Sequence, residues 1–515
     1  MGKKIPMWQV LFVMAFLVVS LMYSMNILNK ITGIDALASD YGTAHIPLIL
    51  SATVAGIIAV ANGWKWSYLE AGIMASINRS MQACLILLII GILIGVWIAA
   101  GVVPAMIYYG LLILKPSIFL AAACLLCCIV SLATGSSWTT AGTIGIALIG
   151  IAQGLDMNIY ITAGAIVSGA YFGDKMSPLS DTTNLAPAIA GSTLFEHIRH
   201  MVYTVTPSLV IALIIYVILG LKHSGNADIN AVYAIQEGLK LNFNITPLLL
   251  IPPLVVIMIV AFKLPAIPGL LGGVFIGAIL GVFTQGVGLN AWLNLSHHGY
   301  TYSATIEEYA PIVAQYGSEI AETTLKNLGQ LLTRGGMESM LFTVSLIICA
   351  MCFGGILDST GMLATLANSL LKFAKGTGSL ITVTVFSCVV VNALAADQYL
   401  SIILPGRMYK EAYEDRRLKS KNLSRVLEDA GTITSCLIPW NTCGATMQTF
   451  LGVKTWGAPG VGYGWWAFLN LINPLVSIFY GFTGFTMEKM TEEEYQLLLK
   501  DRETAKAEAI KAAEA

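Results

Sequence analysis

Long apolar runs of helix length are the feature that most constrains this chain. Each is close to the ~20 residues that carry a helix across a bilayer. Only 11% of the 515 residues are charged and 56% are hydrophobic, whereas about a quarter of a soluble domain is charged. A membrane β-barrel would show short alternating segments instead. The sequence therefore predicts an all-α polytopic protein with spans at 8–29, 45–63, 82–103, 200–221, 245–262, 264–285, 338–357 and 463–484.

Four further segments are apolar but interrupted. The segments 158–191 and 428–453 are broken by polar residues, and each contains a proline at the break. The segments 116–152 and 378–406 are apolar at their ends and polar in the middle. We expect the first two to be broken transmembrane helices and the other two to be re-entrant hairpins. The alternative for each hairpin is a pair of ordinary helices with polar inner faces. This gives about ten crossings plus two hairpins.

The two halves of the chain repeat the same pattern at an offset near 260 residues. The matched positions are Gly101 and Gly361, Ala133 and Ala393, Ser137 and Asp397, and Pro178 and Pro439. Interrupted helices at corresponding places in two halves indicate the binding site of a transporter. We therefore expect an N-terminal helix and loop (1–44), a first repeat (45–221), connecting helices and loops (222–337), a second repeat (338–486) and a charged cytoplasmic tail (487–515).

Lysine and arginine predict the orientation, because cytoplasmic loops carry an excess of both. The loop after the second hairpin is strongly basic, with Arg407, Lys410, Arg416, Arg417, Lys419, Lys421 and Arg425. The long loop 286–337 has two basic residues against four glutamates and is expected outside. Both termini are then cytoplasmic, the hairpins enter from opposite faces, and the repeats are inverted. The first run is too long for a signal peptide and is expected to be retained as the first helix. We expect a multi-pass protein of the cell membrane.

The segment from Gly173 to Asn184 reads G-D-K-M-S-P-L-S-D-T-T-N and interrupts an apolar helix pattern. Charges at membrane depth are costly and mark ion or proton paths. Irregular backbone is tolerated there only inside protein or beside water. We expect a broken helix that binds a charged solute.

Small hard cations prefer oxygen ligands, and a broken helix exposes backbone carbonyls as well. The candidate ligands at this break and at the first hairpin tip are Asp174, Ser177, Ser180, Asp181, Thr182, Thr183, Ser136, Ser137 and Thr139. The second half contributes Asn392, Asp397, Asn441 and Thr442. Together these oxygens are expected to form a sodium-sized cage, with Asp174 and Asp181 as the charged ligands. The alternative for each hydroxyl is that it only satisfies broken backbone or a neighbouring helix.

A buried carboxylate can bind either a proton or a metal ion, so competition for one site produces exchange. Asp174, Lys175 and Asp181 are the expected proton-coupling residues. Lys175 either keeps a carboxylate ionised until sodium or a proton arrives, or makes a fixed ion pair. Among the other charged residues, Glu338 stands out because it begins an otherwise apolar run.

The remaining reactive residues predict no further chemistry. All nine cysteines fall in apolar segments, which favours small buried side chains over a metal or redox centre. His297 and His298 are expected to be solvated in a polar loop. No enzyme or nucleotide-binding motif occurs, and a net charge of -1 argues against nucleic acid. We expect no enzyme activity, and no cofactor apart from transported sodium.

The stretch G-D-K-M-S-P-L-S-D-T-T-N-L-A-P, from Gly173 to Pro187, closely resembles the signature of NhaC-type sodium/proton antiporters. The resemblance extends from about residue 45 to 484 and includes S-L-A-T-G-S-S-W-T-T and I-P-W-N-T-C-G. It implies a two-repeat, hairpin-bearing carrier of the ion-transporter superfamily with an elevator-like movement. It also implies sodium/proton exchange, with Asp174, Ser177, Asp181 and Thr182 in the ion site.

Other functions stay open at this point. Some relatives look like exchangers of small carboxylates such as malate and lactate, and a sodium- or proton-coupled exchanger of these or of amino acids is the alternative. Asn441 and Gln398 would then donate to an anionic group. A channel is also possible, because polar hairpins can line a pore, but two halves built around broken helices suit alternating access better. The partners expected are sodium, protons, the lipid bilayer, a small organic anion under the alternative, and by analogy a second copy in a homodimer.

Overall fold

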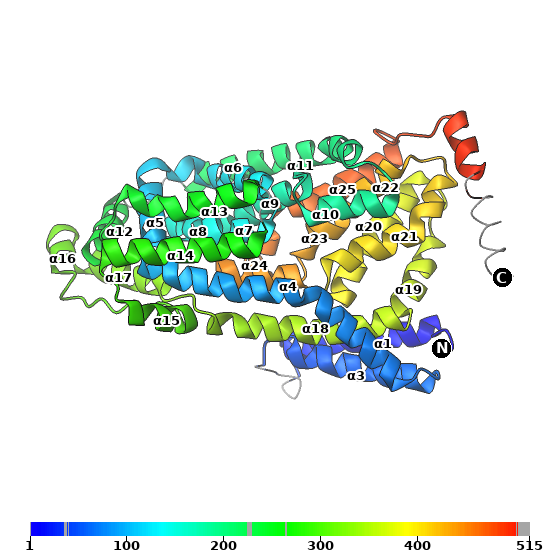
Figure 1. Cartoon of the computed structure of the whole chain (residues 1–515), viewed down its shortest axis with the longest axis horizontal. Coiled ribbons are helices and arrows are strands. Elements are labelled where there is room, and N and C mark those ends of the chain that lie inside the picture. The colour runs from blue at the N-terminus through cyan, green and yellow to red at the C-terminus, as the bar shows by residue number, and fades with distance from the viewer. Residues whose placement is uncertain are drawn as a thin grey trace.

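The computed structural model describes residues 2–34, 39, 41–223, 229–262, 265–500 and 502. This part is helical; it contains two isolated β-bridges and no strand. Most of the longer helices run along the long axis of the molecule (Figure 1). Those long and apolar enough to cross a membrane are α1 (Met7–Ser24), α4 (Trp66–Ala99), α6 (Pro116–Thr134), α11 (Leu194–His223), α14 (Ala266–Gln285), α18 (Leu341–Ser359) and α20 (Thr377–Ala395).

Further apolar helices complete the predicted spans. A bent pair joins α12 (Ile229–Asn242) to η3 (Pro247–Leu250) and α13 (Ile251–Ala261) at 98°. Shorter apolar helices are α3 (His45–Ala61), α5 (Val102–Ile113), α19 (Met362–Leu371) and α25 (Phe468–Thr483). Each of the eight predicted full-length spans thus contains a helix. Outside the four interrupted segments, the remaining helices of the described residues are α2 (Ile27–Thr32), α15 (Leu289–His298), α16 (Ala310–Tyr316), α17 (Ser318–Leu332), η4 (Glu338–Met340) and η6 (Tyr463–Trp465).

One predicted boundary was wrong, because α4 begins at Trp66 and not near residue 82. The first half of this helix is polar, so hydropathy does not mark it. Arg79 in that half forms an ion pair with Asp358 of α18 at 3.2 Å. The two long helices α4 and α18 pack against each other, and α3 packs on α18. They form one layer of the molecule (Figure 1).

All four interrupted segments are divided where the polar residues predict. In 158–191, α9 (Ile159–Met176) and α10 (Asp181–Ala190) flank a short break. In 116–152, α6 is followed after Gly135 and Ser136 by α7 (Ser137–Thr140), the π-helical turn η2 (Ala141–Gly145) and α8 (Ile146–Gly154). The second-half counterparts are α20, α21 (Gln398–Glu414), α22 (Ser420–Leu427), η5 (Glu428–Thr432), α23 (Ile433–Ser435) and α24 (Thr442–Leu451).

The order of elements repeats between the halves. Gly101 and Gly361 both have positive φ and precede short helices. Gly135 and Ala396 both have positive φ at the turn inside a predicted hairpin. In the second hairpin α20 and α21 pack against each other, whereas α6 packs mainly along α9 and α11. The inversion of the repeats and the domain limits stay predictions.

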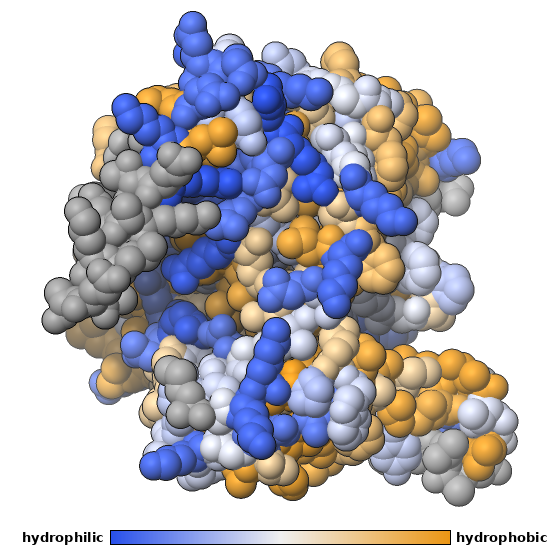
Figure 2. All heavy atoms as spheres, turned by 90° about the vertical axis from the view of Figure 1, so that its right-hand side faces the viewer, coloured by the Kyte–Doolittle hydropathy of each residue, from blue (hydrophilic) through white to orange (hydrophobic). Residues whose placement is uncertain are grey.

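One end of the molecule is polar. Figure 2 views the end toward which α1, α19, α21 and α22 lie, and hydrophilic residues gather across it while hydrophobic ones flank it. The basic segment there is only partly a loop, because its first residues belong to α21 and its last to α22. Arg416, Arg417 and Lys419 lie between the two helices. The predicted tail starts with charged residues that pair with this segment: Lys421 with Glu488 at 2.5 Å and Lys419 with Glu494 at 2.9 Å. The remainder of the tail, 501 and 503–515, lies outside the described residues.

Glycines on α9 allow it to approach α6 closely, as small residues do in membrane helix pairs. A Cβ on Gly169 would lie 2.2 Å from the Cys124 carbonyl oxygen, and one on Gly173 would lie 2.2 Å from the Leu132 nitrogen. Because both atoms met belong to backbone, neither contact can be relieved by a side-chain rotation. This packing sets the position of the break that follows α9.

We expect Gly169→Ala to lower the free energy of unfolding by about 1–3 kcal/mol, because the added methyl group forces the two helices apart. Denaturation of the detergent-solubilised protein would measure the change. Gly288→Ala is the control, since a Cβ there meets no atom within 4 Å. Equal stability of the two variants would contradict the role of this contact.

Candidate functional site

The break between α9 and α10 is stabilised by its own polar side chains. The Thr183 hydroxyl donates to the carbonyl oxygens of Asp174 (2.9 Å) and Lys175 (2.8 Å). The Asn184 amide donates to the carbonyls of Pro178 (2.9 Å) and Ser180 (2.7 Å). The Ser177 hydroxyl accepts from the Leu179 amide at 3.2 Å. These groups satisfy backbone that the proline leaves without helical partners, so this geometry gives Thr183 and Ser177 a structural task.

Asp174 joins the first hairpin turn to this break. Its buried carboxylate accepts from the Ser137 hydroxyl at 2.6 Å and from the Ser180 hydroxyl at 2.7 Å. Ser137 begins α7, and Ser180 precedes α10. Gly135 makes this approach possible, because a Cβ there would lie 2.7 Å from the Leu179 carbonyl carbon. The structure therefore brings together three of the predicted ligands, Asp174, Ser137 and Ser180.

The other first-half candidates lie around this cluster. The Thr182 hydroxyl is 3.1 Å from that of Ser180. Ser136 caps α7 by accepting from the Thr139 amide at 3.1 Å, which is the usual task of a serine before a helix. Asp181 lies in the first turn of α10 and is exposed. A carboxylate there interacts favourably with the helix dipole, but the structure does not bring it into hydrogen-bond contact with Asp174.

In the second half, hydrogen bonds likewise connect the hairpin turn between α20 and α21 to the helix break before α24. The Asn441 amide donates to the Asn392 backbone and side-chain oxygens at 3.0 and 3.1 Å. The Thr442 amide donates to the Ala396 carbonyl at 3.0 Å, and the Thr442 hydroxyl donates to Asn441 at 3.3 Å. The buried Asp397 carboxylate caps α21 by accepting from the Leu400 amide at 2.9 Å. These four candidates hold backbone in place.

Matching contacts in the two halves differ in charge. The pairing of Ser137 with Asp397 predicted from the sequence was off by one residue, because Ser136 and Asp397 are the residues that cap the helices after the two turns. At the resulting offset of 261, Ser137 and Asp174 match Gln398 and Ser435. The Ser435 hydroxyl donates to the Gln398 side-chain oxygen at 3.1 Å, as Ser137 donates to Asp174. The two regions also meet, because α24 packs against α7 and η2. Only the first-half contact contains a carboxylate.

A buried ion-pair cluster connects the halves, and sequence reasoning missed it. Lys175 donates to Asp429 of η5, and neither side chain is exposed. Thr204 of α11 and Asn473 of α25 each donate to the same carboxylate at 2.8 Å. Lys175 therefore forms a buried ion pair in this conformation, and both roles weighed from the sequence stay predictions.

Arg425 and Glu428 complete this cluster. The Arg425 guanidinium lies 3.8 Å from the second Asp429 oxygen and is fully buried. Its prediction as a basic loop residue was wrong, because α22 turns it into the protein. Glu428 is also fully buried, and neither of its carboxylate oxygens has a hydrogen-bond partner among the described residues. The sequence signal was available in L-E-D-A-G-T, from Leu427 to Thr432, which opens a broken span with two carboxylates.

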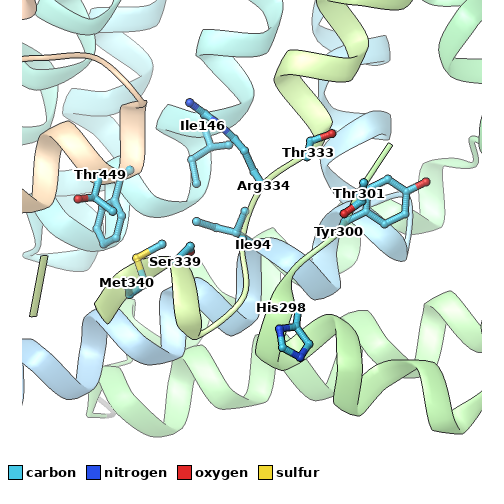
Figure 3. Close-up of a pocket in the computed structure, with 12 residues that line it drawn as sticks. Ile94, Ile146, His298, Tyr300, Thr301, Thr333, Arg334, Ser339, Met340 and Thr449 are labelled. Atoms are coloured by element: carbon cyan, nitrogen blue, oxygen red, sulfur yellow. The ribbon is translucent and has the colours of Figure 1, made fainter. Parts of the chain in front are cut away.

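A separate cavity of about 300 Å³ lies between α4, α8, α24 and the segment before α18 (Figure 3). Arg334 points into it and has a buried guanidinium nitrogen without a partner among the described residues. Hydroxyl groups from Thr333, Ser339 and Thr449 also line the cavity. It does not include the Asp174 cluster. The Arg334 guanidinium suits an anionic group, whereas the Ser339 and Thr449 hydroxyls already donate to the Gly336 and Ala445 carbonyls.

Known proteins resemble this chain over most of its length. The model of the Na+/H+ antiporter family matches residues 169–485. The Na(+)/H(+) antiporter NhaC of Alkalihalophilus pseudofirmus is 36% identical over 446 residues, which cover 86% of this chain and 91% of that protein. The chain belongs to the Na+/H+ antiporter family. Membership of this family and the apolar helices make it a multi-pass membrane protein and a secondary antiporter.

Two antiporters with organic substrates in their names are related to this chain to a similar degree. The arginine/ornithine antiporter ArcD of Halobacterium salinarum is 37% identical over 456 residues, which cover 88% of this chain and 89% of that protein. The malate-2H(+)/Na(+)-lactate antiporter of Bacillus subtilis is 35% identical over 441 residues, which cover 85% of this chain and 89% of that protein. Overall identity therefore does not distinguish an ion exchanger from an exchanger of organic solutes.

The buried ion pair of this antiporter should show strong energetic coupling. Lys175→Met should lower the free energy of unfolding by about 3–5 kcal/mol, because it leaves Asp429 with a poorly compensated buried charge. Lys175→Met/Asp429→Asn should lower it by less than the sum of the two single changes. A double-mutant cycle on unfolding would measure the coupling.

The half-exposed pair Arg79–Asp358 supplies the control for this cycle. Its coupling should be only about 0–1 kcal/mol, as is usual for pairs that water reaches. Similar coupling energies for the two pairs would contradict the assignment.

Proposed function

We propose that the protein exchanges sodium ions for protons by alternating access, with the Asp174 carboxylate as the group that binds both in turn. The observation that carries this proposal is the buried carboxylate held by Ser137 and Ser180, at the meeting point of a helix turn and a helix break. Membership of the antiporter family and the name of the NhaC relative support the choice of ions.

The hydroxyl partners suit a group that changes its protonation state. A hydroxyl can either donate or accept a hydrogen bond. Ser137 and Ser180 donate to an ionised Asp174, and either can rotate to accept a hydrogen bond from the single O–H of the neutral acid. When sodium binds, the carboxylate and both hydroxyl oxygens are available as hard ligands. Thr182, in contact with Ser180, extends this oxygen set, and Asp181 is proposed as an entry ligand because it is exposed near the same break.

Glu428 is proposed as a second proton carrier. Burial of an ionised carboxylate without donors is costly, so this side chain should be protonated in the conformation described. Its neighbour Asp429 is ionised against Lys175 and Arg425. Lys175 directly follows Asp174 in α9 and pairs with Asp429, the neighbour of Glu428. A displacement of Lys175 would therefore change the surroundings of both carboxylates.

The movement proposed is elevator-like. The two turns and the two breaks pack on one another through α7, η2 and α24. The long helices α4 and α18 form a separate layer with α3. We propose that the turns and breaks move together relative to the layer of α3, α4 and α18. We also propose that two copies of the protein pair through this layer.

Exchange of small carboxylates is the second candidate function. Arg334, with its unpartnered nitrogen in a cavity lined by hydroxyls, would bind a carboxylate there. The malate–lactate relative supports this candidate. Proteoliposome transport with sodium alone, and then with malate, lactate or arginine added, would separate the two functions. Sodium-driven proton movement without any organic solute supports the first.

Asp174→Asn should abolish sodium-dependent proton movement, because the amide can neither release a proton nor supply the negative charge. Transport by reconstituted protein with an internal pH dye would measure it. Asp181→Asn should also reduce the rate if Asp181 is an entry ligand. The matched control is Asp156→Asn, at an exposed loop position with a φ of 52° that asparagine tolerates. Near-normal exchange by Asp174→Asn would refute the assignment.

Sodium affinity should weaken as the pH falls. A proton that competes for one carboxylate raises the apparent sodium dissociation constant by up to about tenfold per pH unit once the group is mostly protonated. The constant should level off at high pH, where the carboxylate is ionised. Sodium titrations of the wild-type protein between pH 5 and 9 would show this dependence. A dissociation constant that is flat over this range would exclude a shared carboxylate.

A further inference from the structure

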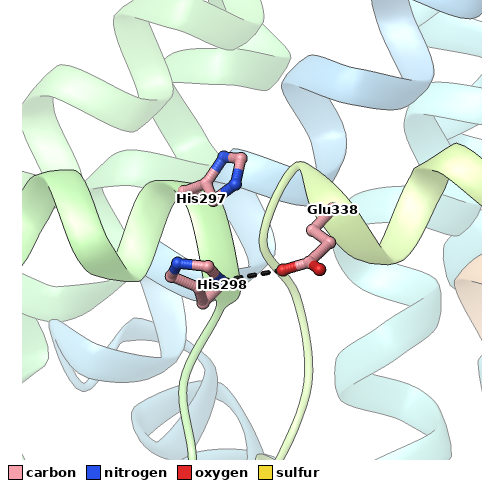
Figure 4. Close-up of side chains that lie close together, drawn as sticks. All are labelled: His297, His298 and Glu338. Carbon is pink, nitrogen blue, oxygen red and sulfur yellow. Dashed lines mark hydrogen bonds and ion pairs between the residues drawn. The ribbon is translucent and has the colours of Figure 1, made fainter.

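We propose that His297, His298 and Glu338 bind a divalent transition-metal ion of the Zn²⁺ class. One ligand atom from each residue lies within 4.8 Å of the other two. Figure 4 shows the two imidazoles at the end of α15 and the carboxylate at the start of η4, with His298 and Glu338 facing each other. The site lies outside the Asp174 cluster and goes beyond sodium/proton exchange.

Backbone contacts hold the two segments together. The Met337 amide donates to the Ser296 carbonyl at 2.9 Å, and Tyr300 and Arg334 exchange two hydrogen bonds of 3.0 and 3.1 Å. Gly336 has a φ of 82°, and a Cβ there would lie 2.4 Å from the His298 carbonyl carbon. The Gly336 amide in turn donates to the Gly91 carbonyl of α4 at 2.7 Å. Main-chain hydrogen bonds therefore fix the two segments that carry the three ligands, and one of these bonds attaches them to the long helix α4.

The side chains themselves remain free to close around an ion. The His298 ring nitrogen Nδ1 lies 2.7 Å from the Glu338 carboxylate, and both side chains are 59% exposed. The rings of His297 and His298 lie 4.5 Å apart at 87°. Tetrahedral zinc bonded to nitrogen and oxygen at about 2.1 Å requires its ligand atoms to be roughly 3.4 Å apart. Small rotations of exposed side chains would achieve this.

The donor set selects the class of ion. Imidazole nitrogen suits Zn²⁺, Cu²⁺ and Ni²⁺, whereas Ca²⁺ and Mg²⁺ prefer oxygen alone. Three protein ligands leave a fourth position for water. The expectation from sequence that both histidines are solvated agrees with their exposure. It did not predict that Glu338, 40 positions further along the chain, lies next to His298. Because His298 also lines the Arg334 cavity, a bound ion would sit at the edge of that cavity and link α15 to η4.

Zinc titration of the full chain, purified in detergent and stripped of metal, tests the proposal. Calorimetry should show one strong Zn²⁺ site in the wild type, and Co²⁺ in its place should give the visible absorption of a tetrahedral complex. His297→Ala, His298→Ala and Glu338→Gln should each weaken Zn²⁺ binding by roughly tenfold or more. Zn²⁺ should raise the thermal midpoint of the wild type, and this shift should shrink in the three variants.

Glu319→Gln is the matched control, since it removes an exposed glutamate from the same connecting segment. It should bind Zn²⁺ as the wild type does. The proposal is overturned if the wild type binds no Zn²⁺. It is also overturned if all three variants keep wild-type affinity, because the ion would then lie elsewhere, for example at the half-buried Cys349 and Cys352. Three exposed positions make it improbable that every variant fails to fold.

Discussion

The buried ion pair between Lys175 and Asp429 is the interaction on which the rest of the arrangement depends. An ion in an apolar interior is tolerated only with a partner and with its remaining hydrogen-bond capacity filled. Asp429 meets this condition at Oδ1, which accepts from Lys175, Thr204 and Asn473. Its Oδ2 has the Arg425 charge 3.8 Å away but no hydrogen bond among the described residues. The pair therefore holds α9, α11, α22 and α25 in one relative position. Asp174 directly precedes Lys175 in α9, so the ion pair also determines the position of Asp174.

A second requirement explains why the motif contains so many hydroxyl and amide groups. Breaking a helix inside a membrane leaves carbonyl and amide groups that water cannot reach. Thr183, Asn184 and Ser136 satisfy such groups in the first half, and Asn392 and Asn441 do so in the second. Ser137 and Ser180 differ from these because they donate to a charged side chain. This difference separates the proposed ligands from the residues that support them.

Local features of the sequence predicted most of the fold. Hydropathy located the spans, and Pro178 and Pro439 located the breaks, because both signals depend on neighbouring residues alone. The start of α4 was missed, since its first half lacks an apolar signal. The motif correctly indicated buried polar chemistry at Asp174, but it did not distinguish this residue from the exposed Asp181. Asp174 is buried on α9, whereas Asp181 is exposed in the first turn of α10, and the motif does not show which side of each helix faces the interior.

Long-range partners could not be predicted in this way. Lys175 and Asp429 lie 254 positions apart, and a single sequence does not indicate which carboxylate a buried lysine meets. Arg425 was assigned to a basic loop because charge counting does not show which face of α22 it occupies. The grouping of His297 and His298 with Glu338 depends on the main-chain turn at Gly336, which sequence alone does not reveal.

The pairing of Ser137 with Asp174, and of Gln398 with Ser435, has a consequence for any solute that lies between the two turns. The corresponding contacts have similar geometry, yet one is anionic and the other is neutral. The second turn still has an acidic group, because the buried Asp397 carboxylate directly precedes Gln398. A cation between the two turns would therefore meet one carboxylate held by two hydroxyls that can rotate and one held by a main-chain amide that cannot.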